Sequence, residues 1–254
     1  MDSIGFPRGE KMAKGFFITA TGTGVGKTVV TGALIRLLKD KGFKTAAMKP
    51  LESGCLRSGD GALVPADGVF LKEMAEMQEA VNEVVPYSFE APLAPMAAAE
   101  IEGARIDVKK IKDQFARLGG RYEAVVVEGV GGLLVPITRD YFPAGGGGYY
   151  VLDLALELGL PLVIVAGLSL GTINHTLLTV RCALDAGAKV AGLIINHQSP
   201  AEGLAEMTNP GAIKELSPVP VIGEFPYLDD LSAGAVGNAA RKNIDFSRLK
   251  AFLL

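Results

Sequence analysis

The sequence contains no tryptophan and only two cysteines, Cys55 and Cys182, among its 254 residues. Two cysteines cannot form a disulfide framework, and such usage is ordinary in the cytoplasm, where we expect this protein. Basic residues number 25 and acidic residues 28, which gives a net charge of −3. Without an excess of positive charge, the protein is not expected to bind nucleic acid or an anionic membrane through a broad surface. Any anion that it binds must be held by a local site.

Long hydrophobic runs are also missing, although the mean hydropathy is positive at +0.31. The longest apolar stretch, residues 158–170, is interrupted by Gly159, Pro161 and Gly167. A spanning helix needs ~18–20 unbroken apolar residues, so no membrane segment is predicted. The apolar run at 15–20 leads into a glycine-rich loop without a cleavage site, which argues against a signal peptide.

An alternation of two hydrophobic patterns runs through the chain. Apolar runs predict strands at 16–20, 45–49, 124–128, 162–166, 190–196 and 219–223, and helical periodicity predicts helices at 27–41, 69–80, 108–118, 151–158, 172–186 and 213–216. This alternation predicts an α/β fold, with one domain built on a mostly parallel sheet that carries helices on both faces. We place the domain at residues 15–254, with 1–14 as a disordered extension and the glycine tract at 145–148 as a mobile surface loop.

A glycine-rich loop, residues 20–28 with the sequence Ala-Thr-Gly-Thr-Gly-Val-Gly-Lys-Thr, separates the first predicted strand from the first helix. Glycines let backbone amides converge on phosphate, and the following helix contributes its positive end. Lys27 can reach the terminal phosphates of a nucleotide, and the hydroxyl of Thr28 can ligate Mg²⁺. A standard loop would have glycine at position 21, so this loop is either one residue longer or has lost its first glycine to Ala20.

Charged residues follow two other predicted strands. Ligands of open parallel sheets bind at the carboxyl ends of strands, where Lys49 and Glu128 are expected. Glu128 precedes glycines and suits a metal-ligating or water-ordering carboxylate. Either Asp60 or Asp67, in the segment after Ser53, could complete a magnesium shell, and spacing alone does not choose between them. Each of these side chains, taken singly, could instead be a solvated charge.

A helix start follows the fourth predicted strand, at residues 168–175. Its exposed amides could bind a carboxylate, while Asn174 and His175 could equally cap the helix and pack. We assign no chemistry to His197, Cys55 or Cys182, because the sequence shows neither zinc-ligand spacing nor a nucleophile elbow.

Five motifs occur in an order that resembles the dethiobiotin synthetase family, across residues 15–228. They are the loop ending Gly-Lys-Thr at 26–28, Lys-Pro-x-x-Ser-Gly at 49–54, Val-Glu-Gly-Val-Gly-Gly at 127–132, Gly-Thr-Ile-Asn-His at 171–175 and Gly-Glu-Phe-Pro-Tyr-Leu at 223–228. The resemblance implies a P-loop NTPase-like fold and an ATP- and Mg²⁺-dependent cyclo-ligase of biotin biosynthesis. Its substrates would be 7,8-diaminononanoate (diaminopelargonate) and CO₂, joined through a carbamate and a carbamic–phosphoric anhydride.

The resemblance also implies roles for particular residues. Lys27 and Lys49 would be catalytic, and Lys49 would also bind the substrate. The other implied ligands of ATP are Gly24, Val25, Gly26, Thr28, Val29, Asp67, Glu128, Gly129, Val130, Gly131, Asn196, Pro226, Tyr227 and Leu228. Thr23 and Ser53 would bind the amine end of the diamine, and Gly171, Thr172, Ile173 and Asn174 of a partner subunit its carboxylate, which implies a homodimer. Thr28, Asp67 and Glu128 would ligate Mg²⁺; Asp67 is preferred to Asp60 because it precedes the helix predicted at 69–80.

The sequence departs from the usual family pattern in its loop. Ala20 stands where the family has glycine, Gly22 where it has an acid, and Gly24 where some members carry glutamate. Met96 replaces a histidine common in the family, and we assign it no role.

Two other classes of enzyme are alternatives to a dethiobiotin synthetase. Nucleotide-switch ATPases often have an additional lysine early in the loop, where this chain has Thr21 and Gly22. Cobyrinate-amidating enzymes need a glutaminase domain, for which the chain has no room. A switch would hydrolyse ATP without small substrates, whereas a synthetase would need the diamine and CO₂.

Overall fold

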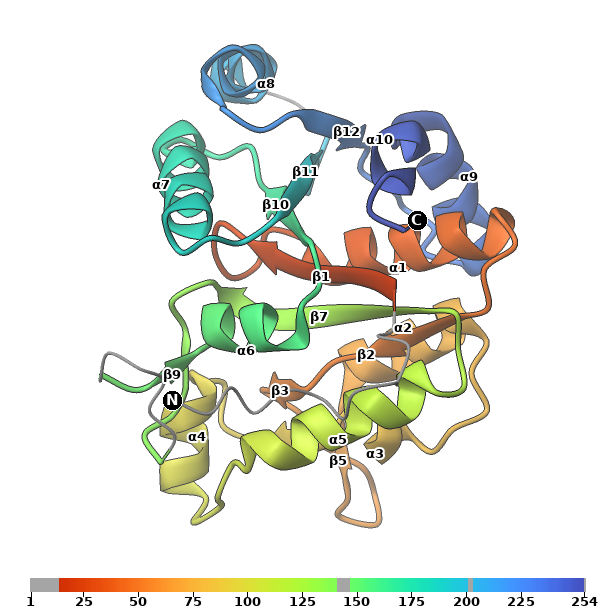
Figure 1. The fold of residues 1–254 in the computed structure, drawn as a ribbon, viewed down its shortest axis with the longest axis vertical. Coiled ribbons are helices and arrows are strands. Elements are labelled where there is room, and N and C mark those ends of the chain that lie inside the picture. The colour runs from red at the N-terminus through yellow and green to blue at the C-terminus, as the bar shows by residue number, and fades with distance from the viewer. Residues whose placement is uncertain (1–13, 141–146, 201–202, 254) are drawn as a thin grey trace.

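The computed structural model describes residues 14–140, 147–200 and 203–253 (Figure 1). Its centre is a six-stranded sheet with the order β12-β11-β10-β1-β7-β2, in which every neighbouring pair is parallel. The strands are β1 (Lys14–Ala20), β2 (Thr45–Met48), β7 (Ala124–Gly132), β10 (Leu162–Ala166), β11 (Val190–Asn196) and β12 (Val221–Phe225). The six predicted strands and the parallel sheet are therefore confirmed.

Several predicted boundaries were wrong. Lys14 belongs to β1 rather than to an extension, whereas residues 1–13 and 145–146 lie outside the described residues. β7 does not end at Glu128 but continues to Gly132, which pairs with Ala20 after an irregularity in register. β12 starts two residues later than predicted, after Pro220, which has no N–H to donate to a ladder.

Helices cover both faces of the sheet. They are α1 (Lys27–Asp40), α2 (Ala66–Ala75), α3 (Val81–Val84), α4 (Pro95–Ile101), α5 (Val108–Gly119), α6 (Val151–Leu158), α7 (Thr172–Asp185), α8 (Leu204–Leu216), α9 (Ala233–Asn243) and α10 (Phe246–Lys250). α1 packs against α2 and α9, and Figure 1 shows α6 and α7 on the other side of the sheet. The chain passes from β1 through α1 to β2 at one edge of the sheet, and later from β7 through α6 to β10 and through α7 to β11, toward the other edge. None of the helices in the described ranges is long and apolar enough to cross a membrane.

Two predicted helices differed from the structure, and other helices were not predicted. The helix predicted at 69–80 spans Ala66–Ala75 and ends at Glu76, whose φ is 56°. Pro210 lies inside α8, and only the last turn of that helix was predicted, at 213–216. α9 was missed, because Val236 is its one large apolar residue, and the short helices α3, α4 and α10 were not predicted either.

Short strands outside the sheet were also missed. They form the pairs β3 (Leu51–Ser53) with β6 (Tyr87–Phe89), β4 (Leu56–Arg57) with β5 (Leu63–Val64), and β8 (Pro136–Thr138) with β9 (Tyr149–Tyr150). Pieces of two or three residues are too short to show a period in sequence. β3 follows β2 in the chain and pairs with β6, and this position brings Glu52 close to α2.

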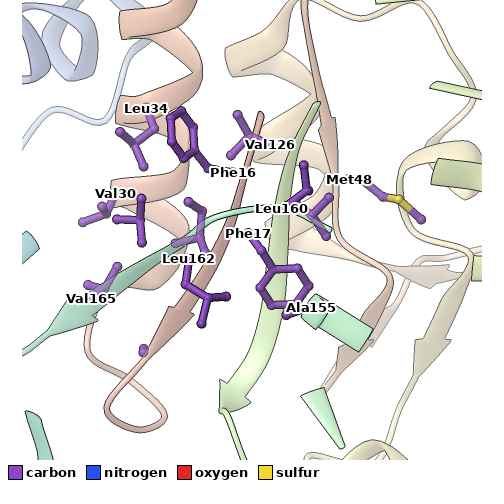
Figure 2. Close-up of a cluster of buried hydrophobic side chains, with 14 of the residues drawn as sticks. Phe16, Phe17, Val30, Leu34, Met48, Val126, Ala155, Leu160, Leu162 and Val165 are labelled. Atoms are coloured by element: carbon purple, nitrogen blue, oxygen red, sulfur yellow. The ribbon is translucent and has the colours of Figure 1, made fainter. Parts of the chain in front are cut away.

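The core lies on both faces of β1, as expected for a central parallel strand. Phe16 and Phe17 are both fully buried. Figure 2 shows Phe16 beside Leu34 of α1, and Phe17 on the opposite side toward Ala155 of α6. The two aromatic rings therefore fix α1 and α6 to opposite faces of the strand that leads into the glycine-rich loop.

Gly15 generates a prediction about stability. Its φ is +144°, and a Cβ built there would lie 1.9 Å from the carbonyl oxygen of Val125 on β7. We expect Gly15→Ala to lower the free energy of unfolding by at least ~2 kcal/mol in urea titrations, because the backbone is strained and the strands must separate. Gly211→Ala is the control, since its Cβ would meet nothing within 4 Å in α8. Gly211→Ala should keep or raise the stability, because alanine is favoured over glycine inside a helix. A Gly15→Ala variant that is as stable as the wild type would contradict the prediction.

Candidate functional site

The glycine-rich loop connects β1 to α1 at the carboxyl edge of the sheet. Gly24 and Gly26 have φ values of +78° and +84°, a conformation that side chains disfavour. A Cβ on Gly26 would also lie 2.1 Å from Nδ2 of Asn196, which donates to the carbonyl of Val25. Within the described chain, no side chain caps the first turn of α1, and that turn contains no acidic residue. Its amides are therefore oriented to accept an anion.

Lys49 lies at the centre of a cluster of charges beside this loop. Its Nζ is 2.6 Å from Oδ2 of Asp67 and 2.6 Å from Oε1 of Glu128. The hydroxyl of Thr28 donates to the same Glu128 oxygen over 2.9 Å. Lys49 follows β2, Glu128 lies in β7, Thr28 is in the first turn of α1 and Asp67 in that of α2. The structure thus brings Lys49 and Glu128 together from neighbouring strands, as the strand-end argument predicted.

Burial determines the electrostatics of the two lysines. The Lys49 side chain is 5% exposed and that of Glu128 is fully buried. Burial by itself would lower the pKa of Lys49, but the carboxylates of Glu128 and Asp67 outweigh it and hold the pKa above its ordinary value. Burial lowers the pKa of Lys27, and Lys49 adds to this shift, while Glu128 and Asp67 oppose it. Both lysines therefore lie in a region with little water, where Lys49 pairs with two carboxylates.

The donors around Lys49 suit a hard cation such as Mg²⁺. Thr28, Asp67 and Glu128 offer oxygen atoms, and Oε2 of Glu128 is buried without a hydrogen-bond partner among the described residues. The described chain contains no group of three His, Cys, Asp or Glu side chains that could hold a metal alone. Mg²⁺ commonly takes one or two carboxylates and completes its shell with phosphate oxygens and water, so the donor set fits.

Asp60 and Asp67, which spacing could not separate, lie in different environments. Asp60 is exposed, and its Oδ1 accepts from the Ser58 hydroxyl and the Ala62 amide within its own turn. The Ser58 hydroxyl contributes most to holding the pKa of Asp60 below its usual range. Asp67 is the second residue of α2 rather than a residue preceding the helix, and it contacts Lys49. Of the two, only Asp67 lies at the candidate site.

A second group of predicted residues lies at the ends of β11 and β12. Asn196 is 3% exposed and lies opposite Phe225 in the β11–β12 ladder. Phe225 is followed directly by Pro226, Tyr227 and Leu228. A cavity of ≈ 440 Å³ is lined by His197, Ser199, Pro200, Glu224, Pro226, Tyr227 and Asn243. Oδ1 of Asn196 is buried and has no partner among the described residues. The cavity is large enough for a planar base; His197, which follows Asn196, is in its lining, whereas Asn196 itself is not.

Two residues near the loop were missed or given no role, His197 and Gln198. His197 lines the cavity, and its Nε2 is 3.9 Å from a carboxylate oxygen of Glu224. Gln198 donates to the carbonyl of Gly24. The position of these residues directly after Asn196, at a strand end, was the available signal.

The predicted substrate residues are spread along the carboxyl edge. Thr23 is exposed in the loop, and Ser53 is the last residue of β3. Gly131 lies close to Thr23, since a Cβ built on Gly131 would be 3.6 Å from the Thr23 hydroxyl. Val29 is half-buried in α1, while Gly129 and Val130 lie within β7 rather than in a loop after it.

The helix start at residues 171–174 is separated from the Lys49 cluster. Gly171 is the N-cap of α7, with φ +93°, and no side chain of the described chain caps that helix. Asn174 and His175 are exposed, so the capping and packing alternative is not what the structure shows. Thr172 is buried and donates to the carbonyl of Gly167. Two strands, β1 and β7, lie between this helix start and Lys49 in the sheet order, so one chain does not bring the two groups together.

Comparison with known proteins gives consistent results. A family model described as an AAA domain matches residues 14–235. The ATP-dependent dethiobiotin synthetase BioD of Thermodesulfovibrio yellowstonii is 44% identical over 94% of this chain and 99% of its own length. The enzyme of the same name from Bacillus licheniformis is 40% identical over 92% of this chain and 94% of its length.

One solved structure supports the fold. The MinC:MinD cell division protein complex of Aquifex aeolicus matches with a TM-score of 0.51 and 15% identity, covering 91% of this chain and 95% of that chain. A likeness at this identity shows a shared architecture and nothing about the reaction.

The buried ion pair predicts a stability effect that is independent of any reaction. Lys49→Ala leaves the Glu128 carboxylate buried beside Asp67 without its ammonium partner. Removing one partner of a buried pair costs about 3–5 kcal/mol, and we expect a loss near 3 kcal/mol in urea unfolding at pH 7, because Asp67 is partly exposed. The double variant Lys49→Ala, Glu128→Gln should recover part of this loss, since it leaves no buried charge. A double variant as unstable as the sum of its parts would contradict this account.

Proposed function

Because this chain belongs to the dethiobiotin synthetase family, we infer that it catalyses the reaction of that family. It is an ATP-dependent cyclo-ligase of biotin biosynthesis, which closes the ureido ring of dethiobiotin from 7,8-diaminononanoate and CO₂. The observation that carries this proposal is the meeting of Lys49, Glu128 and Thr28 beside the glycine-rich loop.

The proposed reaction has three steps. One amine of the diamine attacks CO₂, loses a proton and becomes a carbamate. A carbamate oxygen attacks the γ-phosphorus of ATP, the bond to ADP breaks, and a carbamic–phosphoric anhydride forms. The second amine then attacks the carbonyl carbon, phosphate leaves with the electron pair of the C–O bond, and the nitrogen loses a proton as the ring closes. Since both amines belong to one oriented molecule, the last step is intramolecular.

Lys27 and Lys49 would carry most of the electrostatic work. Lys27 holds the terminal phosphates, and Lys49 binds both the carbamate and the γ-phosphate. Their burial supports these roles, because opposite charges attract more strongly where water is scarce. Positioning and neutralisation of charge are the main demands of phosphoryl transfer, and no covalent intermediate with the protein is required.

Thr28, Asp67 and Glu128 would hold Mg²⁺ with ATP. The bound ion would neutralise charge on the phosphate oxygens of the nucleotide. Oε2 of Glu128 supports this proposal, since it has no donor in the part of the chain that the structure describes, and a buried carboxylate oxygen without a donor is costly unless another group satisfies it. Lys49 already bonds Oε1 of Glu128, so Oε2 is the oxygen that would be left to bind the ion.

The remaining nucleotide contacts would come from three segments. Gly24, Val25, Gly26 and Val29 surround the phosphates, together with Gly129, Val130 and Gly131 from β7. Asn196 and the turn formed by Pro226, Tyr227 and Leu228 would hold adenine, with Oδ1 of Asn196 accepting from its amino group. The free acceptor and the adjoining cavity support this assignment.

The diamine site would be completed by a second copy of the chain. Thr23 and Ser53 would bind the amine end, and the helix start at Gly171, Thr172, Ile173 and Asn174 would bind the carboxylate in the other subunit's site. The separation of this helix start from Lys49 within one chain supports a homodimer. So does the exposure of apolar side chains around it, since Leu170 is 90% and Leu178 60% exposed.

The deciding experiment is release of ADP with each substrate omitted in turn. We expect steady ADP release only when ATP, Mg²⁺, the diamine and bicarbonate as a source of CO₂ are all present, with formation of dethiobiotin in equal amount. Release at the same rate without the diamine would instead identify a nucleotide-switch ATPase and overturn the proposal.

Lys49→Ala tests the role of the lysine in turnover. We expect at least a ~10²-fold loss of dethiobiotin formation, because one donor to the transferring group is removed, while ATP binding measured by calorimetry persists. Thermal denaturation must show that the variant is folded at the assay temperature. Near-normal turnover in a folded variant would remove Lys49 from the mechanism.

Glu128→Gln tests the metal assignment. An amide is a weaker ligand than a carboxylate, so the Mg²⁺ concentration for half-maximal rate should rise. Glu90→Gln, at an exposed carboxylate paired with Arg57, is the matched control and should leave the titration unchanged. An unchanged titration for Glu128→Gln would argue against ligation there.

A further inference from the structure

Glu52 is a buried carboxylate to which the reaction above assigns no task. It lies in β3 and is 6% exposed. Its Oε1 accepts from the amide of Asp67 and its Oε2 from the amide of Gly68, each over 2.9 Å. A carboxylate is costly to bury unless both oxygens find donors, and here both donors belong to the first turn of α2.

The start of α2 needs this carboxylate. The N-cap of α2 is Pro65, which has no side-chain acceptor, so the first amides of the helix depend on a group from elsewhere. Glu52 supplies two acceptors and a negative charge at the positive end of the helix. Gly68 permits the close approach of Val85, because a Cβ there would lie 2.0 Å from Cγ2 of Val85, whereas it would lie 3.5 Å from Oε2 of Glu52.

The contact fixes the residue that matters for the site. The amide that Glu52 Oε1 accepts belongs to Asp67 itself, whose carboxylate meets Lys49 at 2.6 Å. Glu52 is also three residues from Lys49 along the chain. One short segment therefore sets the positions of both charges relative to each other.

We propose that Glu52 is a positioning residue that holds the backbone of Asp67 so that its carboxylate faces Lys49 and the metal position. This inference rests on the proposed role of Asp67 as a ligand of Mg²⁺. A residue that merely stabilised α2 would raise the stability of the protein without changing its affinity for the ion. A positioning residue changes that affinity, and it does so only through Asp67.

The test measures Mn²⁺ binding by electron paramagnetic resonance, with a non-hydrolysable ATP analogue bound to the full-length protein. We expect Glu52→Ala to weaken Mn²⁺ binding by about 10–100-fold, as for other residues that orient ligands. Glu52→Gln should lose less, since its amide oxygen can still accept one of the two bonds. Glu73→Gln removes an exposed charge from the same helix and should leave binding unchanged.

A double-mutant cycle shows whether Glu52 acts through Asp67. In the presence of Asp67→Asn, adding Glu52→Ala should cause no further loss of Mn²⁺ affinity, because the ligand that it positions is already gone. Additive losses would overturn the proposal. If Glu52→Ala fails to fold, the same cycle is run with Glu52→Gln.

Hydrogen exchange of the α2 amides separates the two proposals. We expect faster exchange at Asp67 and Gly68 in Glu52→Ala, with or without metal, and unchanged exchange would overturn the positioning role. If exchange accelerates but Asp67→Asn leaves Mn²⁺ binding intact, the metal role proposed for Asp67 fails, and Glu52 is left as a cap of α2 alone.

Discussion

The buried ammonium of Lys49, placed between Glu128 and Asp67, is the interaction on which the site depends. Two ionised carboxylates repel each other, and the repulsion is strong where one of them, here Glu128, is fully buried; a positive charge between them offsets it. The ammonium makes their approach possible and thereby joins β2, β7 and α2 at one point. Thr28 adds α1 through its bond to Glu128. The site is thus also a junction of the fold.

The surrounding structure places unsatisfied groups where a nucleotide would satisfy them. Among the described residues, the first turn of α1 has uncapped amides, and Glu128 and Asn196 each keep a buried acceptor without a donor. Buried polar groups are rarely left without partners in proteins, so these three features at the carboxyl edge of the sheet are informative. It agrees with an enzyme that is complete only when its ligands are bound.

The sequence predicted those features that depend on local pattern. Apolar runs identified the six central strands, and parallel strands share one carboxyl edge, so Lys49 and Glu128 could be expected to meet. The choice between Asp60 and Asp67 depended on the path of residues 54–65, whose short strands have no readable period. The end of α2 was equally hidden, because it depends on Arg36 and Lys39 of α1, which bond the carbonyls of Met74 and Ala75. The contact of Glu52 with α2 spans 15 residues and leaves no local trace.

Charged side chains from other elements bond both ends of α2. Glu52 holds its first turn, while Arg36 and Lys39 bond its last carbonyls and the Glu76 carboxylate that follows. α1 begins with Lys27 and Thr28, and its later residues Arg36 and Lys39 bond the C-terminal end of α2, the helix that carries Asp67. α1 and α2 are therefore joined at the last turn of α2. The position of Asp67 relative to Lys27 and Thr28 therefore depends on contacts between the two helices as well as on the sheet.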